Sequence, residues 1–288
     1  MVDLIEYTDH PVLHEPLMVL ALDGWIDAGL AAGGALNAML AEHGHELVAS
    51  FDTDLLLDHR ARRPMMSIRE GVSERLAWPA IELRALTDDN GNHVLLLGGA
   101  EPDHLWGSFT DTVVRAALDL DVRMIIGLGA YPAPVPHTRD VRLSMTSPSP
   151  DLLSAFSGYT LGSVEVPAGI QAAIEVAASA AGLPSLALWA QVPHYISGMG
   201  YPAGSRALIE HVNRVGGVAL RTGGLEEAAA ANIAQLNDLV GENEQHQQML
   251  HQLEQIYDDS GPELYGPLPT GDELAAELQA FLRDHRPE

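Results

Sequence analysis

In residues 1–220, hydrophobic residues gather in short runs that alternate with longer stretches of helical spacing. The runs at 18–22, 94–97 and 124–126 are apolar without alternation, which is typical of strands covered on both faces. We predict strands at 17–22, 46–51, 65–68, 81–86, 93–98, 122–128 and 186–192, and helices at 28–42, 104–120, 169–181 and 202–215. This alternation favours an α/β sandwich with a mostly parallel central sheet.

The composition changes at Gly223 and Gly224, after which the chain is rich in Ala, Glu, Gln and Asn. Residues 225–257 are predicted to form one long helix or two helices. A segment rich in Pro and Gly follows near 261–269, and a short capped helix comes after it. The sequence therefore predicts an α/β domain at 1–222 and a helical C-terminal appendage at 223–288.

Ile233, Leu236 and Val240 form an apolar stripe along the predicted helical appendage. A lone helix could not bury this stripe completely. We interpret it as packing within the chain or as an oligomer seam, in preference to a helix that recognises a specific partner. The stripe leads us to expect a homo-oligomer, with a trimer as a guess at its stoichiometry.

Forty acidic residues against fifteen arginines give the chain a formal net charge of −25 at pH 7. Because no basic stripe is present to replace counterions on phosphates, we expect no nucleic-acid partner. The same charge argues against binding to an anionic membrane surface. The partners that we expect are other proteins.

The chain contains no cysteine and no lysine. The first absence excludes disulfides, thiolate nucleophiles and cysteine zinc sites. The second excludes Schiff-base chemistry and the phosphate-binding lysine of a Walker A loop. The apolar runs are strand-sized and too short to span a bilayer, and the N-terminus lacks the basic segment of a signal peptide. We therefore expect a cytoplasmic protein.

Asp23, Trp25 and Asp27 follow the first long predicted strand and lead into a helix. Ligands of open α/β sheets bind beyond the carboxyl ends of the strands, so this loop is a candidate for binding a ligand or a partner. The start of the helix could hold an anion through its free N–H groups. We interpret Asp27 first as the N-cap of that helix.

His137 and Arg139 project from the most unusual stretch of the chain, at 127–139, where three prolines alternate with small residues after a predicted strand. Proline restricts the backbone, so this loop is predicted to be extended and stiff. Histidine can exchange protons, and arginine can clamp a carboxylate or a phosphate. The alternative is a structural loop in which Arg139 pairs with a carboxylate, so that removing Arg139 costs more stability than removing His137.

His194 follows another predicted strand and completes the candidate set. If these loops are neighbours, His137, Arg139 and His194 could converge with Asp23. The chain has no G-x-S-x-G nucleophile elbow and no H-E-x-x-H metal pair. We therefore expect no catalytic residue, no metal ligand and no cofactor.

Several of these loops together resemble the actinobacterial branch of the proteasome assembly chaperone 2 family. The segments that carry the resemblance are 21–29, 62–64, 101–103, 127–139, 166–170, 192–195 and 271–283. Its most specific element is the proline-rich loop with His137, Thr138 and Arg139. The resemblance extends over nearly the whole chain.

The resemblance implies an α/β fold of the phosphorylase/hydrolase-like kind, related in topology to purine nucleoside phosphorylases. It implies a non-enzymatic role, since eukaryotic and archaeal relatives bind proteasome α-subunits during assembly. Some of these relatives dock through a tail of a hydrophobic residue, Tyr and any residue. Residues 284–288 here are Asp-His-Arg-Pro-Glu, so we do not expect docking of that kind. The resemblance transfers no catalytic residue.

We therefore favour a non-catalytic protein-binding or assembly-chaperone-like protein over an enzyme, with proteasome subunits among its candidate partners. One alternative is a hydrolase- or phosphorylase-type enzyme that uses the loops after the strands. Another is a small-molecule binding protein with the same loops. The α/β architecture hosts enzymes and non-enzymes alike, so it does not choose between them.

Overall fold

The structure is a computed structural model, which describes residues 4–8, 12–24 and 26–259. It is built on an eight-stranded sheet with the order β1-β3-β6-β7-β2-β8-β10-β9. The strands are β1 Ile5–Tyr7, β2 Leu17–Asp23, β3 His45–Phe51, β6 Ile81–Thr87, β7 His93–Ala100, β8 Met124–Ala133, β9 Leu143–Thr146 and β10 Ser185–Pro193. The helices are α1 Ala31–Glu42, α2 Thr53–Leu56, α3 Trp106–Asp119, α4 Pro150–Ser154, α5 Ile170–Ala180, α6 Pro202–Gly216, α7 Leu225–Gly241 and α8 Glu244–Asp259, with 3-10 turns η1 Ala28–Leu30 and η2 His194–Ile196.

The centre of the sheet is parallel and its margins are antiparallel. Strands β7, β2, β8 and β10 pair in parallel, whereas β1, β3 and β6 on one side and β9 on the other pair antiparallel. The α/β fold is confirmed, and the parallel pairing that the apolar runs predicted lies in this central part. Parallel strands need helical crossovers, which place helices on both faces of the sheet.

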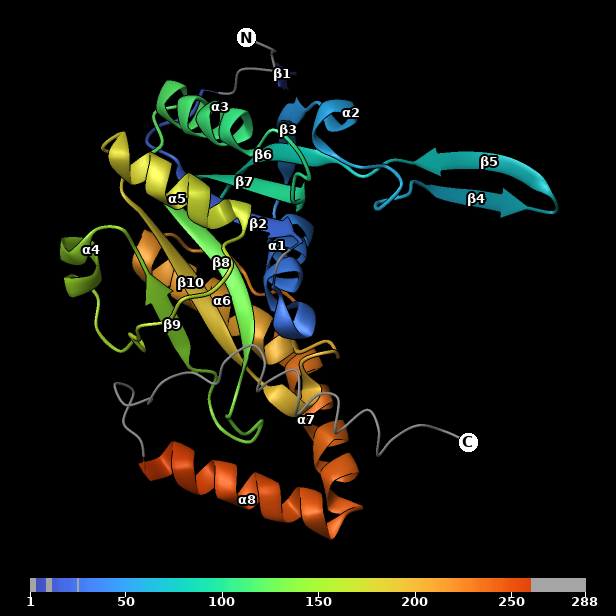
Figure 1. The fold of residues 1–288 in the computed structure, drawn as a ribbon, viewed down its shortest axis with the longest axis vertical. Helices are drawn as coiled ribbons and strands as arrows, with labels where there is room; N and C mark the ends of the chain where they lie inside the picture. Colours follow the sequence, from blue (N-terminus) through green and yellow to red (C-terminus); the bar gives the residue numbers. More distant parts are fainter. Residues whose placement is uncertain (1–3, 9–11, 25, 260–288) are drawn as a thin grey trace.

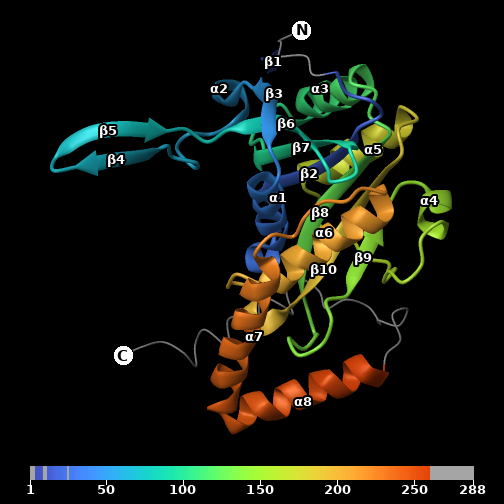
Figure 2. The ribbon, with the colours of Figure 1, turned by 180° about the vertical axis from the view of Figure 1, so that it is seen from behind.

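Helices cover both faces of the sheet (Figures 1 and 2). Alternate residues of β2 enter two separate cores, as the two-residue period of a strand requires. Leu17 and Val19 pack in the core beneath α1 and α6, whereas Met18 and Leu20 pack in the core beneath α3 and α5. This two-sided burial explains why the run has no alternation of polar and apolar residues.

Every predicted strand and the four predicted helices are present, with ends shifted by a few residues. Five elements of six residues or fewer were not predicted: β1, β5, β9, α2 and α4. Elements of this length carry too little periodicity to be distinguished from loops.

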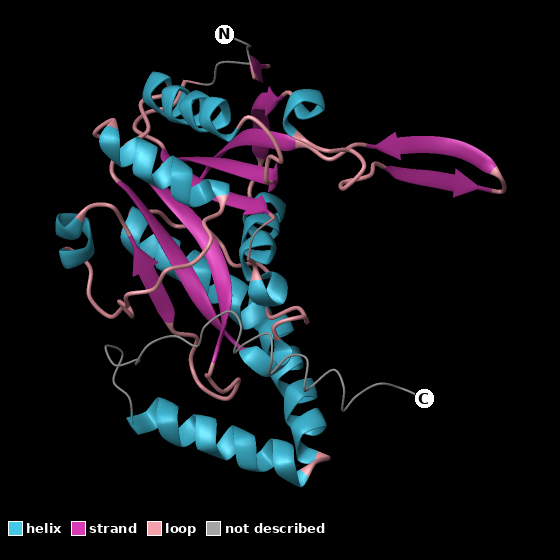
Figure 3. Cartoon of the chain, viewed as in Figure 1, coloured by secondary structure: helices cyan, strands magenta, loops and turns pink. Residues whose placement is uncertain are grey.

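The strand predicted at 65–68 forms, but outside the central sheet. It is β4, Met65–Arg69, which pairs only with β5, Val72–Ala77, in a separate two-stranded sheet. This hairpin projects away from the body of the protein (Figure 3). Its apolar residues are therefore exposed, although apolar runs of this kind predict burial.

The C-terminal helical region consists of two helices that meet at an angle (Figure 1). Helix α7 ends at Gly241 and α8 begins at Glu244. Leu236 and Val240 are only 3% and 8% exposed, so the chain itself covers most of the apolar stripe. Burial by a second copy is not needed for these residues, and the stripe was the wrong reason to expect an oligomer. The link and the short helix predicted after residue 260 lie outside the described residues.

Among the described residues, no helix is both long enough and apolar enough to cross a membrane.

Candidate functional site

The first candidate region lies where β2 ends. Asp23 is the last residue of that strand, and Asp27 comes directly before η1. The carboxylate of Asp27 accepts hydrogen bonds from the backbone N–H groups of Ala32 and Gly33, at 2.8 and 2.9 Å. Asp27 therefore caps the first turn of α1, as a cap residue satisfies N–H groups that have no partner within the helix. Trp25 lies outside the described residues.

Asp23 lies close to a second carboxylate and to an arginine. Partial burial of its carboxyl, followed by the charge of Asp27, raises the pKa of Asp23, while the charge of Arg62 opposes that rise. The Arg62 Nε atom lies 3.3 Å from Asp103 Oδ2, and its guanidinium also reaches the backbone oxygen of Asp23. The side chains of Arg62 and Asp103 are both partly exposed, so their ion pair contributes little to stability.

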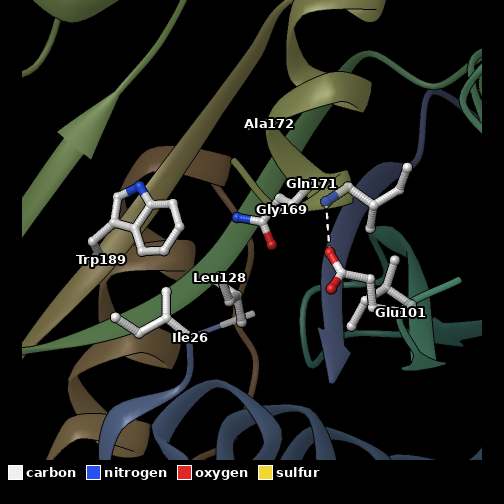
Figure 4. Close-up of a pocket in the computed structure, with 9 residues that line it drawn as sticks. Ile26, Glu101, Leu128, Gly169, Gln171, Ala172 and Trp189 are labelled. Atoms are coloured by element: carbon white, nitrogen blue, oxygen red, sulfur yellow. Dashed lines mark hydrogen bonds between the residues drawn. The ribbon is translucent and has the colours of Figure 1, made fainter. Parts of the chain in front are cut away.

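Glu101 occupies the position where a ligand anion would bind. Its Oε1 atom accepts a hydrogen bond of 2.7 Å from the backbone N–H of Ile170, the first residue of α5 (Figure 4). The start of a helix is a natural anion site because its N–H groups are free and its dipole is positive there. Gly24 leaves room for this side chain, since a Cβ atom at Gly24 would overlap with Glu101.

The cavity next to Glu101 is small. Its volume is about 30 Å³, which is room for one or two water molecules. Gln171 and Trp189 fill the space over two glycines of β8, because Cβ atoms at Gly127 and Gly129 would overlap with these two side chains. The Gln171 Nε2 atom is buried and has no hydrogen-bond partner among the described residues. These side chains leave only a small pocket at this end of the sheet (Figure 4).

The second candidate region is the proline-rich loop, where His137 is only 1% exposed. Its Nδ1 atom lies 2.7 Å from the hydroxyl oxygen of Tyr195, and its Nε2 atom lies 3.1 Å from Asn237 Oδ1. The amide oxygen of Asn237 can only accept, so Nε2 carries the proton and Nδ1 accepts from the tyrosine hydroxyl. Burial lowers the pKa of His137, against the opposing effects of Asn237 and Glu254. The imidazole is therefore neutral, and both of its nitrogen atoms are engaged.

Arg139 binds two carboxylates on α8. Its Nη1 atom lies 3.1 Å from Glu254 Oε1, and its Nη2 atom lies 2.7 Å from Asp258 Oδ2. Hydrogen bonding from Thr138 and the charge of Arg139 hold the pKa of Glu254 below its usual range. The arginine thus joins the loop to the last described helix, as the structural interpretation of this loop predicts.

The five predicted site residues that the structure describes do not form one cluster. Asp23 and Asp27 lie together at the end of β2, whereas His137 and Arg139 contact α7 and α8. His194 reaches the second group through an edge contact with the ring of Tyr195, at 5.4 Å between centroids. No described contact joins Asp23 to His137. No group of three or more His, Asp or Glu side chains in the described part of the chain could hold a metal ion.

Sequence reasoning missed the residues that complete both regions, which are Glu101, Gln171, Tyr195, Asn237 and Glu254. A signal existed for Glu101, which directly follows the buried strand β7, just as Asp23 ends the buried strand β2. Asn237 and Glu254 are about a hundred residues away from the loop that they contact, and no local pattern marks them.

The model of the PAC2 family matches residues 21–240 of the chain. No curated protein matches it at a significant level. A Mycobacterium tuberculosis protein of unknown function is 35% identical, with 88% of this chain and 91% of that chain covered and a TM-score of 0.82. A proteasome-assembly chaperone homologue from the same organism is 30% identical, with coverages of 81% and 99% and a TM-score of 0.74.

An archaeal proteasome activator from Pyrococcus furiosus is 15% identical to the chain. The aligned parts cover 82% of this chain and 97% of that one, with a TM-score of 0.62. At this identity the likeness is one of fold alone.

Proposed function

This chain belongs to the PAC2 family, and we propose that it is a non-catalytic member that binds other proteins and acts as an assembly chaperone. Proteasome subunits are the partners we propose first, because one relative at 30% identity is described as a proteasome-assembly chaperone homologue. We further propose that the chain works in the cytoplasm, as a homo-oligomer. Residues 1–222 would supply the α/β body and residues 223–288 a helical appendage.

The observation that carries the proposal is the small size of the pocket at this end of the sheet. Sites for small molecules usually have volumes of roughly 300–1,000 Å³. The cavity here has about 30 Å³, and Glu101 already occupies the N-terminus of α5. An enzyme of the phosphorylase or hydrolase type would need room for its substrate in this place. Protein binding needs no such room.

The hydrogen bonds of His137 also support a non-catalytic role. A general acid or base must reach the proton of its substrate, either directly or through one water molecule. Both nitrogen atoms of His137 already have partners within the chain, and the ring is buried. In this proposal the proline-rich loop therefore has a structural role and no catalytic one.

Replacing the carboxylate of Glu101 tests whether the chain itself closes the anion site. We expect Glu101→Ala to destabilise the protein by about 1–2 kcal/mol, because the N–H of Ile170 loses its acceptor. Inorganic phosphate should raise the melting temperature of Glu101→Ala and leave that of the wild type unchanged. Asp103→Ala is the matched control, which removes a nearby carboxylate that does not cap α5.

The proposed function itself is tested with the purified full-length chain. We expect a complex with proteasome α-subunits of the same organism in light scattering, and no turnover of general esterase, phosphatase or nucleosidase substrates. Turnover that His137→Ala abolishes without a change in stability would establish the enzyme alternative. A phosphate-dependent rise in the melting temperature of the wild type would instead favour the small-molecule binding protein.

A further inference from the structure

A groove lies between helix α7 and the loop that joins η2 to α6. Its volume is about 340 Å³, and its lining consists of Met199, Asn232, Gln235, Leu236, Asp238 and Leu239. Residues 232, 235, 236 and 239 recur at the spacing of one helix face, so α7 presents a single side to the groove. Leu236 is only 3% exposed and forms the floor, whereas Met199 and Leu239 are 48% and 53% exposed and form apolar rims.

The shape and lining of this α7 groove are typical of helix recognition. A site that binds a helix is an open apolar groove, which receives hydrophobic residues at helical spacing. A site for a small molecule instead encloses most of the ligand and holds several converging polar groups. The α7 groove is open, and Met199 and Leu239 offer it half-exposed apolar side chains. Methionine adapts to the shape of a partner and is common at surfaces that bind peptides.

The charge around the groove favours a basic partner. Asp238 belongs to the lining, and residues 225–259 contain eight acidic residues and no arginine or lysine. Glu254 and Asp258 pair with Arg139, which leaves six of the eight without an ion pair in the described part of the chain. Opposite charges across an interface steer association and exclude partners of the wrong sign. Lysine or arginine beside the apolar residues of a bound helix meets this requirement.

A hydrogen-bond acceptor at the groove points to the same partner. The Oδ1 atom of Asn232 is buried and has no hydrogen-bond partner among the described residues. A buried acceptor without a donor costs free energy. Turning this amide toward the groove breaks no hydrogen bond of the oxygen atom, and an ammonium or guanidinium group of a bound helix supplies the missing donor. Asn232 therefore adds a polar contact to the apolar rims.

The C-terminal segment of the chain itself is a poor match for the groove. Residues 260–288 contain six acidic residues and two arginines, so their formal charge is −4. Like charges across an interface repel each other. The occupant that the charge favours is therefore a basic segment of a different protein.

We propose that the α7 groove binds a basic amphipathic helix of a partner protein. Apolar residues of that helix pack on Leu236 between Met199 and Leu239, and its lysines or arginines face Asp238 and the other carboxylates nearby. The inference rests on the protein-binding function proposed above and gives that function a place on the molecule.

The probe for this groove is a model peptide of about 15 residues, with leucine at helical spacing and lysine elsewhere. Its fluorescence anisotropy is followed as the full-length chain is added. We expect the lysine peptide to bind, and a peptide with glutamate in place of every lysine not to bind. Salt should weaken the binding, because the charged contacts lie at the surface. Equal affinity of the two peptides, or no binding of the lysine peptide, would overturn the proposal.

Variants then locate the binding on the protein. We expect Met199→Ser/Leu239→Ser to weaken it by about tenfold or more, and Asp238→Asn by a smaller factor. Val176→Ser, at a residue that is 60% exposed on α5, and Asp111→Asn on α3 are the matched controls, and both should bind the peptide as the wild type does. Unchanged melting curves show that the variants fold. Equal affinity of the groove variants and the wild type would mean that the peptide binds elsewhere, which refutes the proposal.

Asn232→Ala separates recognition from stability. We expect it to weaken peptide binding without lowering the melting temperature, because the replaced oxygen has no partner in the chain. A lower melting temperature with unchanged binding would show a structural role for Asn232 and contradict its place in the groove contact.

Two results would identify a different occupant and overturn the proposal. Tighter peptide binding by Leu274→Ser/Leu278→Ser would show that the C-terminal segment fills the groove. Dissociation of a wild-type oligomer by Met199→Ser/Leu239→Ser in light scattering would show that a second copy fills it. A chain that forms a complex with proteasome α-subunits but binds no peptide refutes the groove and keeps the proposed function. A chain that binds the peptide in the groove but no α-subunit supports the groove and refutes that partner.

Discussion

The imidazole of His137 joins three segments of the chain, because it contacts Tyr195 after β10 and Asn237 on α7 from within the proline-rich loop. His137→Ala leaves a cavity and removes both hydrogen bonds, so we expect a loss of about 2–4 kcal/mol in unfolding free energy. Arg139→Ala should cost less, because the arginine is partly exposed and surface ion pairs are weak. This order reverses the one expected from the sequence. Urea denaturation of both variants measures it, and equal losses would contradict it.

Glu175 on α5 predicts a pH dependence of stability. Burial raises its pKa from 4.5 to about 8, so the folded protein binds a proton that the unfolded chain has released between these values. Stability is therefore lost as the pH rises from 4.5 to 8. We expect Glu175→Gln, which cannot ionise, to be more stable than the wild type by about 1–3 kcal/mol at pH 8, with little difference at pH 4.5. Denaturation at both pH values measures this, and a difference independent of pH would contradict it.

At the scale of elements, α8 is attached to the body mainly through polar contacts. Arg139 binds Glu254 and Asp258, and only Leu253 of this helix is buried. Segments with few buried apolar contacts open more readily than the core. We expect Arg139→Ala to increase hydrogen exchange of α8 severalfold while exchange in β2 and β8 stays unchanged. High salt should act in the same direction.

A matched control for this prediction is Arg84→Ala, which breaks an ion pair of similar exposure with Glu82 on β6. It should leave the exchange of α8 unchanged. Faster exchange over the whole chain in Arg139→Ala would mean that the arginine stabilises the fold globally and does not act as a local tie.

At the scale of the whole molecule, the structure indicates how much of the C-terminal part can be removed before the chain loses its stability. Ala229 and Leu236 of α7 belong to the same core as α1 and α6. We expect a chain that ends at residue 243 to unfold cooperatively, near the stability of the full chain. A chain that ends at residue 222 should be several kcal/mol less stable and should bind a hydrophobic dye, because it exposes that core. Equal stability of the two would support the predicted boundary at residue 222.

Sequence patterns alone were sufficient to predict the α/β class, the long strands and the main helices. A strand buried on both faces gives a continuous apolar run, and a helix buried on one face gives apolar residues at helical spacing. The cap formed by Asp27 and a carboxylate partner for Arg139 also follow from local chemistry. The projection of the β4–β5 hairpin and the burial of Leu236 could not be predicted. An apolar residue gives the same sequence pattern whether the folded chain buries it or leaves it exposed.

The capping of α5 depends on Glu101 meeting Ile170, and the tautomer of His137 depends on Asn237, across sequence separations of 69 and 100 residues. Such contacts arise from the strand order and the packing of helices on the sheet. No local sequence pattern predicts them, because the free energy that selects these partners depends on the packing of the whole folded chain.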